Sequence, residues 1–281
     1  MCLWKPTRES QADAGHPATM HLPTQRLIHI ARRVAQTLPE GMHAGVLACV
    51  RFGRLPELRE ALRHKLATEN KLEGVDVMVT AGANQAFMSL VLAMLDHESK
   101  AVLFAPYYFN HMMALQMTGA EVVVADCDDT FVPDMTKLEA ILAPGDVSMV
   151  VVCNPCNPTG ILTPKATLDK CAELCATYGA SLVVDNTYDY FTFDGEVHEC
   201  VAGHHVVNLF SFSKAFGMMG YRVGYIAYPA ESELKGSLLK VQDTVPICAN
   251  IFGQVVALNA LKVLPIALAH LPTRIPLVRF A

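Results

Sequence analysis

The sequence predicts an α/β fold with a mixed, mostly parallel sheet flanked by helices. Two observations carry this prediction. From residue 55 onward, short apolar runs typical of strands alternate with longer segments of helical periodicity. Some of these runs, such as the one within residues 148–153, are almost uninterrupted, which favours strands buried on both faces.

The first helix is expected at residues 56–69, where Leu58, Leu62 and Leu66 recur at helical spacing and Pro56 suits the first turn. Strands are then expected at residues 76–80, 100–105, 121–125, 148–153, 181–185, 206–210 and 223–228. Further helices are expected at residues 84–95, 107–118, 134–142 and 164–178. The pattern weakens from about residue 245.

This pattern divides the 281 residues into three parts. We expect an irregular N-terminal segment at residues 1–54, a large domain at residues 55–251 and an atypical tail at residues 252–281. The formal charge of −5 argues against a nucleic-acid partner. The longest apolar stretch, residues 86–95, is about half of what a membrane-spanning helix needs, so no membrane partner is expected.

The nine cysteines are an odd number, and the N-terminus has no apolar core of a secretory signal. Both observations favour reduced thiols and a cytoplasmic location. Arg26, Arg32 and Arg33 lie on a possible amphipathic helix, which leaves organelle targeting as an alternative.

Unusual residues follow several of the expected strands, where ligands bind in open α/β sheets. Small residues at positions 80–84 open a helix, and free amides at a helix start suit an anion such as phosphate. Any tight strand-to-helix turn would give a similar pattern. Neither a dinucleotide-binding glycine motif nor a P-loop motif is present.

The run Asn-Pro-Cys-Asn-Pro-Thr-Gly at residues 154–160 predicts a rigid loop that can aim Asn157 at a ligand, or else a turn that only ends the strand. Asp185 ends another apolar strand, and no partner for it lies nearby in the sequence. A buried carboxylate needs a partner, so a ligand cation is one interpretation and a helix cap is the other. Tyr188 follows closely enough to face the same pocket.

Lys214 lies between Phe212 and the pair Ala215-Phe216. Desolvation there would favour a neutral, nucleophilic amine that forms imines with aldehydes. Ser211, Ser213 and Arg222 are candidates to bind an acidic group nearby. The alternative is an ordinary surface lysine.

These segments, taken in order, resemble the motifs of fold-type I, pyridoxal-phosphate-dependent aminotransferases of class I and II. Residues 154–160 resemble the family's N-P-x-N-P-[TS]-G loop, residues 183–188 its D-x-x-Y strand end, and residues 211–224 its lysine box. Residues 81–87 and 105–110 are similar to plant and algal aromatic-amino-acid aminotransferases. The resemblance implies the large domain of that fold and transamination between an amino acid and a 2-oxo acid of the phenylpyruvate or indolepyruvate type.

The resemblance also implies roles for single residues. Lys214 would be the Schiff-base lysine and proton shuttle, Asp185 would pair with the pyridinium nitrogen, and Tyr188 and Asn157 would bind the ring O3′. Tyr108 would stack on the ring. The remaining positions would hold the phosphate: Ala83, Asn84, Ser211, Ser213 and Arg222. The resemblance implies a homodimer with shared active sites, and it implies no metal.

The chain departs from the family in two places. Residues 50–59 offer no clear counterpart of the family's tyrosine that reaches the partner subunit's phosphate. No segment resembles the small C-terminal domain, which supplies an arginine for the substrate carboxylate, so a truncated form is expected.

Three alternatives stay open at this point. One is a catalytically impaired remnant that still binds pyridoxal phosphate, and another is a different reaction of that cofactor, such as that of a lyase or decarboxylase. The third is a zinc module, because Cys153, Cys156, Cys171 and Cys175 have a spacing that zinc sites use.

Overall fold

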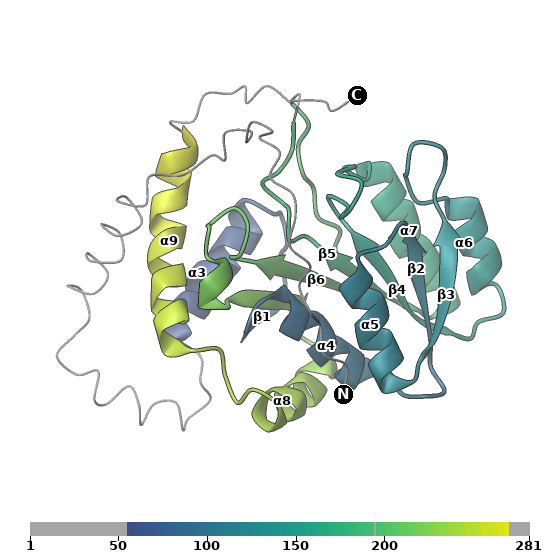
Figure 1. The fold of residues 1–281 in the computed structure, drawn as a ribbon, viewed down its shortest axis with the longest axis horizontal. Coiled ribbons are helices and arrows are strands. Elements are labelled where there is room, and N and C mark those ends of the chain that lie inside the picture. Colours follow the sequence, from purple (N-terminus) through teal and green to yellow (C-terminus); the bar gives the residue numbers. More distant parts are fainter. Residues whose placement is uncertain (1–54, 194, 270–281) are drawn as a thin grey trace, which may run out of the picture. The chain divides into compact units, whose positions relative to one another are not determined.

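A computed structural model of the chain describes residues 55–193 and 195–269. Within this part, seven strands form one sheet in the order β1-β7-β6-β5-β4-β2-β3 (Figure 1). The strands are β1 (Val75–Thr80), β2 (Lys100–Ala105), β3 (Glu121–Asp126), β4 (Val147–Cys153), β5 (Ser181–Asp185), β6 (Val206–Ser211) and β7 (Gly224–Pro229). Only β7 pairs antiparallel, with β1 and β6, and the other pairs are parallel. The predicted mixed, mostly parallel sheet is confirmed.

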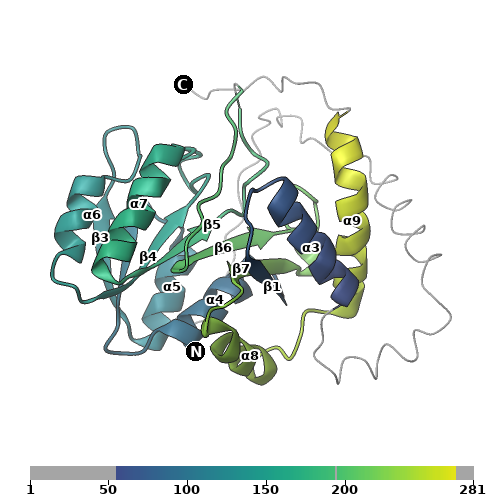
Figure 2. The same ribbon diagram turned by 180° about the vertical axis from the view of Figure 1, so that it is seen from behind.

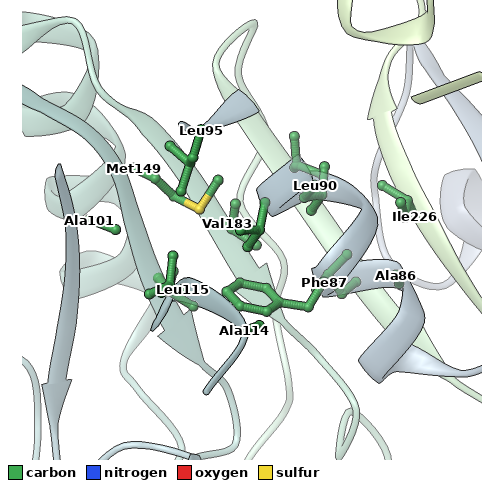
Figure 3. Packing of buried hydrophobic residues seen from close by; sticks show 14 of the residues in the cluster. Ala86, Phe87, Leu90, Leu95, Ala101, Ala114, Leu115, Met149, Val183 and Ile226 are labelled. Carbon is green, nitrogen blue, oxygen red and sulfur yellow. The ribbon is translucent and has the colours of Figure 1, made fainter. Parts of the chain in front are cut away.

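One face of the sheet is covered by α4 (Ala83–Met94), α5 (Phe109–Thr118) and α8 (Leu234–Thr244). Phe87 and Leu90 of α4 and Leu115 of α5 pack onto Met149 of β4 and Val183 of β5 (Figure 3). All five side chains are at most 1% exposed. Apolar burial of this extent is the main favourable contribution to folding.

The opposite face carries α6 (Met135–Leu142) over β3 and α7 (Lys165–Tyr178) over β5, and it carries α3 (Pro56–Thr68) and α9 (Ile251–Ala269) over β1, β6 and β7 (Figure 2). Successive residues of one strand serve both faces. In β4, Met149 and Val151 belong to the first cluster, whereas Val150 and Val152 belong to the second. This alternation explains why the strand is apolar throughout.

Two helices lie where the sequence analysis expected none. α8 buries Leu238 and Gln242 but has Gly236 in its first turns, which weakens its helical signal. α9 begins at Ile251 and packs on α3, with Ala257 fully buried. The Gln254 Oε1 accepts a hydrogen bond of 2.8 Å from the Leu55 backbone N–H. The expected tail at residues 252–281 therefore starts inside a helix, and its last part, like residues 1–54, lies outside the described residues.

Strand register brings the chemically interesting residues to one edge. Cys153 at the end of β4 lies opposite Asp185 at the end of β5, and Asp185 lies opposite Leu209 of β6. Because β4, β5 and β6 are parallel, the loops that follow them leave the sheet at the same edge. Among the described residues, no helix combines the length and the apolar character that crossing a membrane requires.

Candidate active site

All ten residues that the sequence analysis selected line one cavity at this edge of the sheet. They come from five separate segments of the chain and are Ala83, Asn84, Tyr108, Asn157, Asp185, Tyr188, Ser211, Ser213, Lys214 and Arg222. Cys153, Thr187 and Met219 complete the lining. The cavity thus combines an amine, a buried carboxylate and a guanidinium group.

Asp185 is 4% exposed and has a partner within the chain. Its Oδ2 lies 2.9 Å from Nε2 of His111 on α5, and its Oδ1 accepts a hydrogen bond of 3.0 Å from the Thr187 backbone N–H. Burial acts to raise the pKa of Asp185, but the hydrogen bond and electrostatic effect of His111 and the hydrogen bonds from Thr187 outweigh it and hold the pKa below its usual value. Asp185 is therefore a buried carboxylate that stays ionised.

His111 was missed by the sequence analysis. It is 3% exposed and packs against the ring of Phe87 at a centroid distance of 4.3 Å and against Tyr108 at 5.2 Å. The sequence showed no partner near Asp185, and the structure supplies one that lies 74 residues earlier in the chain. No local signal identifies such a pair.

An anion cradle lies at the start of α4. Gly82 precedes the helix with a φ of +89°, and no side-chain hydrogen bond from this position caps the first amides of α4. Arg222 closes the other side, where its Nη2 donates to the Ala81 carbonyl at 3.3 Å and its Nη1 lies 3.5 Å from the Ser213 Oγ. Amides at a helix start and a guanidinium group are the donors that phosphate prefers.

Two glycines make this close approach possible. A Cβ at Gly82 would lie 2.2 Å from the Arg222 Nη2. A Cβ at Gly224 would lie 2.8 Å from the Ala83 backbone N and 2.7 Å from the Gly82 carbonyl carbon. Side chains at either position would fill the space in which β7, the helix start and Arg222 meet.

Lys214 faces the cavity, and its Nζ lies 5.4 Å from the centre of the Tyr188 ring. The expectation that apolar neighbours desolvate Lys214 was wrong, since the residue is exposed. Phe212 instead points into the core on the other side, where its ring packs 4.6 Å from Phe216 and 6.0 Å from Tyr225. Neighbours in sequence therefore do not cover the amine.

Similarity to known proteins agrees with the arrangement of the cavity residues. The family model of class I and II aminotransferases matches residues 20–270. The chain belongs to this family. The expected fold and family, whose enzymes depend on pyridoxal phosphate, are thereby confirmed.

Two curated relatives illustrate the match. The Aromatic aminotransferase ISS1 of Arabidopsis thaliana is 49% identical over 213 residues, which are 74% of this chain and 54% of that protein. The Aspartate/prephenate aminotransferase of Thermus thermophilus is 33% identical over 183 residues, or 63% of this chain and 47% of that protein. The chain therefore spans about half the length of these relatives.

Solved structures of aminotransferases share the fold. A double mutant of the Thermus thermophilus aspartate aminotransferase superposes with a TM-score of 0.75 at 28% identity, covering 91% of this chain and 65% of that one. The aromatic aminotransferase from Pyrococcus horikoshii gives a TM-score of 0.73 at 26% identity, covering 85% and 64%.

The structure gives no support to a zinc module. Cys171 and Cys175 pack in the apolar cluster beneath α7. Burial raises the pKa of the Cys153 thiol well above its usual range, which disfavours the thiolate that binds zinc. Within the described residues, no group of three or more His, Cys, Asp or Glu side chains is arranged to hold a metal ion.

Proposed function

We propose that this chain is the cofactor-binding part of an enzyme that transfers an amino group from an amino acid to a 2-oxo acid. The observation that carries the proposal is the placement of Lys214, the ionised Asp185 and the Arg222 cradle around one cavity. These are the three groups that pyridoxal phosphate needs: an amine for its aldehyde, an anion for its ring nitrogen and donors for its phosphate.

The cradle gathers donors that suit a phosphate. Gly82 and Gly224 let the helix start, β7 and the Arg222 guanidinium approach closely, since a Cβ at these positions would lie 2.2 Å from the Arg222 Nη2 and 2.8 Å from the Ala83 backbone N, respectively. Ser211 and Ser213 are buried beside it, and the Ser211 Oγ accepts a hydrogen bond of 3.0 Å from the Ser213 backbone N–H. The hydroxyls of Ser211 and Ser213 are available to donate toward an anion.

When bound, pyridoxal phosphate supplies an aldehyde that condenses with amines and a ring that withdraws electrons from the substrate Cα. Asp185, kept ionised by His111, would hold a proton on the ring nitrogen opposite it. Lys214 would attach the cofactor and, once free, would move the proton from the substrate Cα to the cofactor C4′. Tyr188 and Asn157 would orient the ring through its O3′, and Tyr108 would cover one ring face.

For the substrate, we propose an aromatic amino acid and its 2-oxo acid. The support is the Arabidopsis relative, which is named an aromatic aminotransferase and shares 49% identity. The described residues contain no arginine that we assign to the substrate carboxylate. The substrate assignment therefore depends on this relative rather than on the geometry of the cavity.

Covalent trapping tests the cofactor proposal. Purified protein with pyridoxal phosphate is expected to be yellow and to lose that colour on borohydride reduction, with the added mass on the peptide containing Lys214. Lys214→Ala is expected to abolish the attachment, while Lys165→Ala, on α7, serves as the matched control. Attachment at another lysine would contradict the assignment.

Product analysis tests the reaction. With phenylalanine or methionine as donor and an aromatic 2-oxo acid as acceptor, the expected products are the exchanged amino acid and 2-oxo acid in equal amounts. Release of ammonia or carbon dioxide instead would indicate a lyase or a decarboxylase. Cofactor attachment without any turnover would indicate the impaired, cofactor-binding form.

We also propose a homodimer located in the cytoplasm. The support for the dimer is the apolar row Phe109, Met113 and Met117 on α5, whose members are 62%, 51% and 76% exposed. The support for the compartment is that the cysteines of the described residues are free thiols. Sedimentation velocity and fractionation are the corresponding measurements.

A further inference from the structure

Lys65 of α3 is a buried lysine outside the cavity. Its residue is 5% exposed, and its Nζ donates to the Asn70 Oδ1 at 2.8 Å and to the Asp189 Oδ2 at 3.4 Å. The Nζ also lies 5.1 Å from the centre of the Tyr190 ring and 5.3 Å from that of Phe210. An ammonium group is costly to bury, so this set of partners fixes where it and Asp189 lie.

Asp189 directly follows Tyr188, the residue that we propose to orient the cofactor ring. The segment between Asp185 and Phe191 is a tight turn, in which the Asp189 N–H donates to the Asn186 carbonyl at 3.0 Å and the Phe191 N–H donates to the Tyr188 carbonyl at 2.8 Å. A displacement of Asp189 is therefore passed on to Tyr188. The start of the turn is fixed independently, by Asp185 and its His111 partner.

A second contact joins α3 to the same turn. The Tyr190 hydroxyl donates to Oε2 of Glu69, the residue after α3, at 2.6 Å. The two residues after Tyr188 are thus both held by one short segment of the chain, residues 65–70. The Tyr188 ring contacts the Phe191 ring at a centroid distance of 5.8 Å and lies 5.4 Å from the Lys214 Nζ.

Keeping Asp189 ionised has a cost that Lys65 offsets only in part. Burial raises the pKa of Asp189 to about 6, in spite of the opposing charge of Lys65. A carboxylate whose pKa is raised on folding favours the folded state below its unfolded pKa and loses that contribution as the pH rises through the folded value. At neutral pH the ionised Asp189 therefore lowers stability relative to its protonated form, and the contacts of Lys65 reduce this loss while they fix the position of Asp189.

We propose that Lys65 is a positioning residue that acts through Asp189 to hold Tyr188 against the cofactor ring. This inference rests on the proposed function, because it needs pyridoxal phosphate in the cavity. Tyr188 donating to the ring O3′ would withdraw charge from it and lower the pKa of the cofactor's attached nitrogen. Loss of Lys65 would weaken that hydrogen bond from a distance.

The test is a pH titration of the visible absorption of the pyridoxal phosphate complex. In Lys65→Met, the pKa of the absorption change is expected to rise by about one unit, which is tenfold in proton affinity. In Asp189→Asn, whose side-chain oxygen still accepts from Lys65, the pKa is expected to stay near that of the wild type. Lys165→Met removes an equal charge from α7 and is expected to change nothing.

Lys65→Met leaves Asp189 buried without its cation and can fail to fold. The double variant Lys65→Met/Asp189→Asn removes both charges, and the same rise in the absorption pKa is expected from it. Amide hydrogen exchange of residues 186–191 in the cofactor-free protein adds a second readout, with faster exchange expected in both Lys65 variants.

The outcomes separate the two proposals. A wild-type absorption band that persists in both Lys65 variants with an unchanged pKa overturns the role of Lys65 and leaves the proposed function intact. If the wild-type protein shows no band at all, the proposed function fails and the role of Lys65 fails with it. A shift of equal size in Lys165→Met would also overturn the inference, because it would show a nonspecific effect of charge.

Discussion

His111 and Asp185, 74 residues apart in the chain, meet at 2.9 Å beneath the candidate active site. Their side chains are 3% and 6% exposed, so each group depends on the other for its main polar contact. Asp185 belongs to the sheet, whereas His111 belongs to a covering helix. The pair therefore couples the docking of α5 to the charge that faces the cavity.

Replacing His111 by phenylalanine should leave Asp185 buried without its hydrogen-bonded partner. We expect the folded protein to lose on the order of 3 kcal/mol at pH 7, because breaking a buried pair leaves an uncompensated charge. The wild-type pKa of Asp185 lies below its ordinary value of 3.8, so its stabilising contribution is present above that pH and is lost as the pH falls below it. The deficit of the variant should shrink below pH 4, as urea unfolding at several pH values would reveal.

The control for this prediction is His97→Phe, at a side chain that is 80% exposed. It makes the same chemical change away from Asp185 and should stay within about 0.5 kcal/mol of the wild type. Equal destabilisation by both variants would contradict the pairing argument. Weaker binding of pyridoxal phosphate is expected in His111→Phe only.

Gly82→Ala should damage anion binding more than it damages the fold. The added Cβ would meet the Arg222 Nη2, which is the far end of a flexible side chain and can move out of the cradle. The backbone strain at a φ of +89° adds about 1–3 kcal/mol of destabilisation. The affinity for pyridoxal phosphate, measured by absorbance titration, should fall at least tenfold.

Gly236→Ala is the matched control for that substitution. Gly236 lies on α8, has no atom within 4 Å of an added Cβ and has no positive φ. Alanine is the better helix former, so stability should stay equal or rise by about 0.5–1 kcal/mol. A loss of cofactor affinity in Gly236→Ala would refute the cradle as the cause.

Arg222→Gln should distinguish phosphate binding from ring binding. If the guanidinium holds the phosphate, the variant should lose about 100-fold in affinity for pyridoxal phosphate, since a hydrogen bond to a charged group contributes about 1.5–3 kcal/mol. Affinity for pyridoxal, which has no phosphate, should change less than about threefold. Arg63→Gln, on α3, is the matched control. A parallel loss for both ligands would argue that Arg222 serves the structure of the cavity instead.

Much of the fold could be predicted because its signals are local. Strand β5 was expected at residues 181–185 and is found at Ser181–Asp185, since its apolar run and the carboxylate that ends it are both visible in the sequence. The ten cavity residues were selected with the help of the family resemblance. Most of them lie at or soon after the ends of strands, and strand order together with parallel pairing brings such positions to one edge.

What escaped prediction depends on contacts between distant segments. The pairing of His111 with Asp185 and that of Lys65 with Asp189 follow from helix docking, which no sequence spacing encodes. The exposure of Lys214 was missed because the side chain of Phe212 turns into the core while that of Lys214 turns outward. α9 was missed because its residues show no clear polar face and therefore no helical periodicity.

The environment of Asp76 indicates how the free energy of unfolding changes in acid. At the start of β1, its Oδ1 accepts from the Arg59 Nη2 at 2.5 Å, and its Oδ2 lies 3.3 Å from the Lys235 Nζ. Burial opposes ionisation, but the hydrogen bond from the Val77 backbone and the charge of Arg59 lower the pKa of Asp76 to about 2. Because the folded pKa lies below the unfolded value of 3.8, the stabilising contribution is present above that pH and is lost as the pH falls toward 2.

Asp76→Asn should therefore lower the free energy of unfolding at pH 6 by about 1–3 kcal/mol and flatten its decline between pH 4 and pH 2. Asp146→Asn removes an exposed carboxylate that pairs with Lys100, and it should change stability by less than about 1 kcal/mol. Urea unfolding across this pH range gives both numbers, and an acid limb in Asp76→Asn as steep as that of the wild type would show that other carboxylates control acid unfolding.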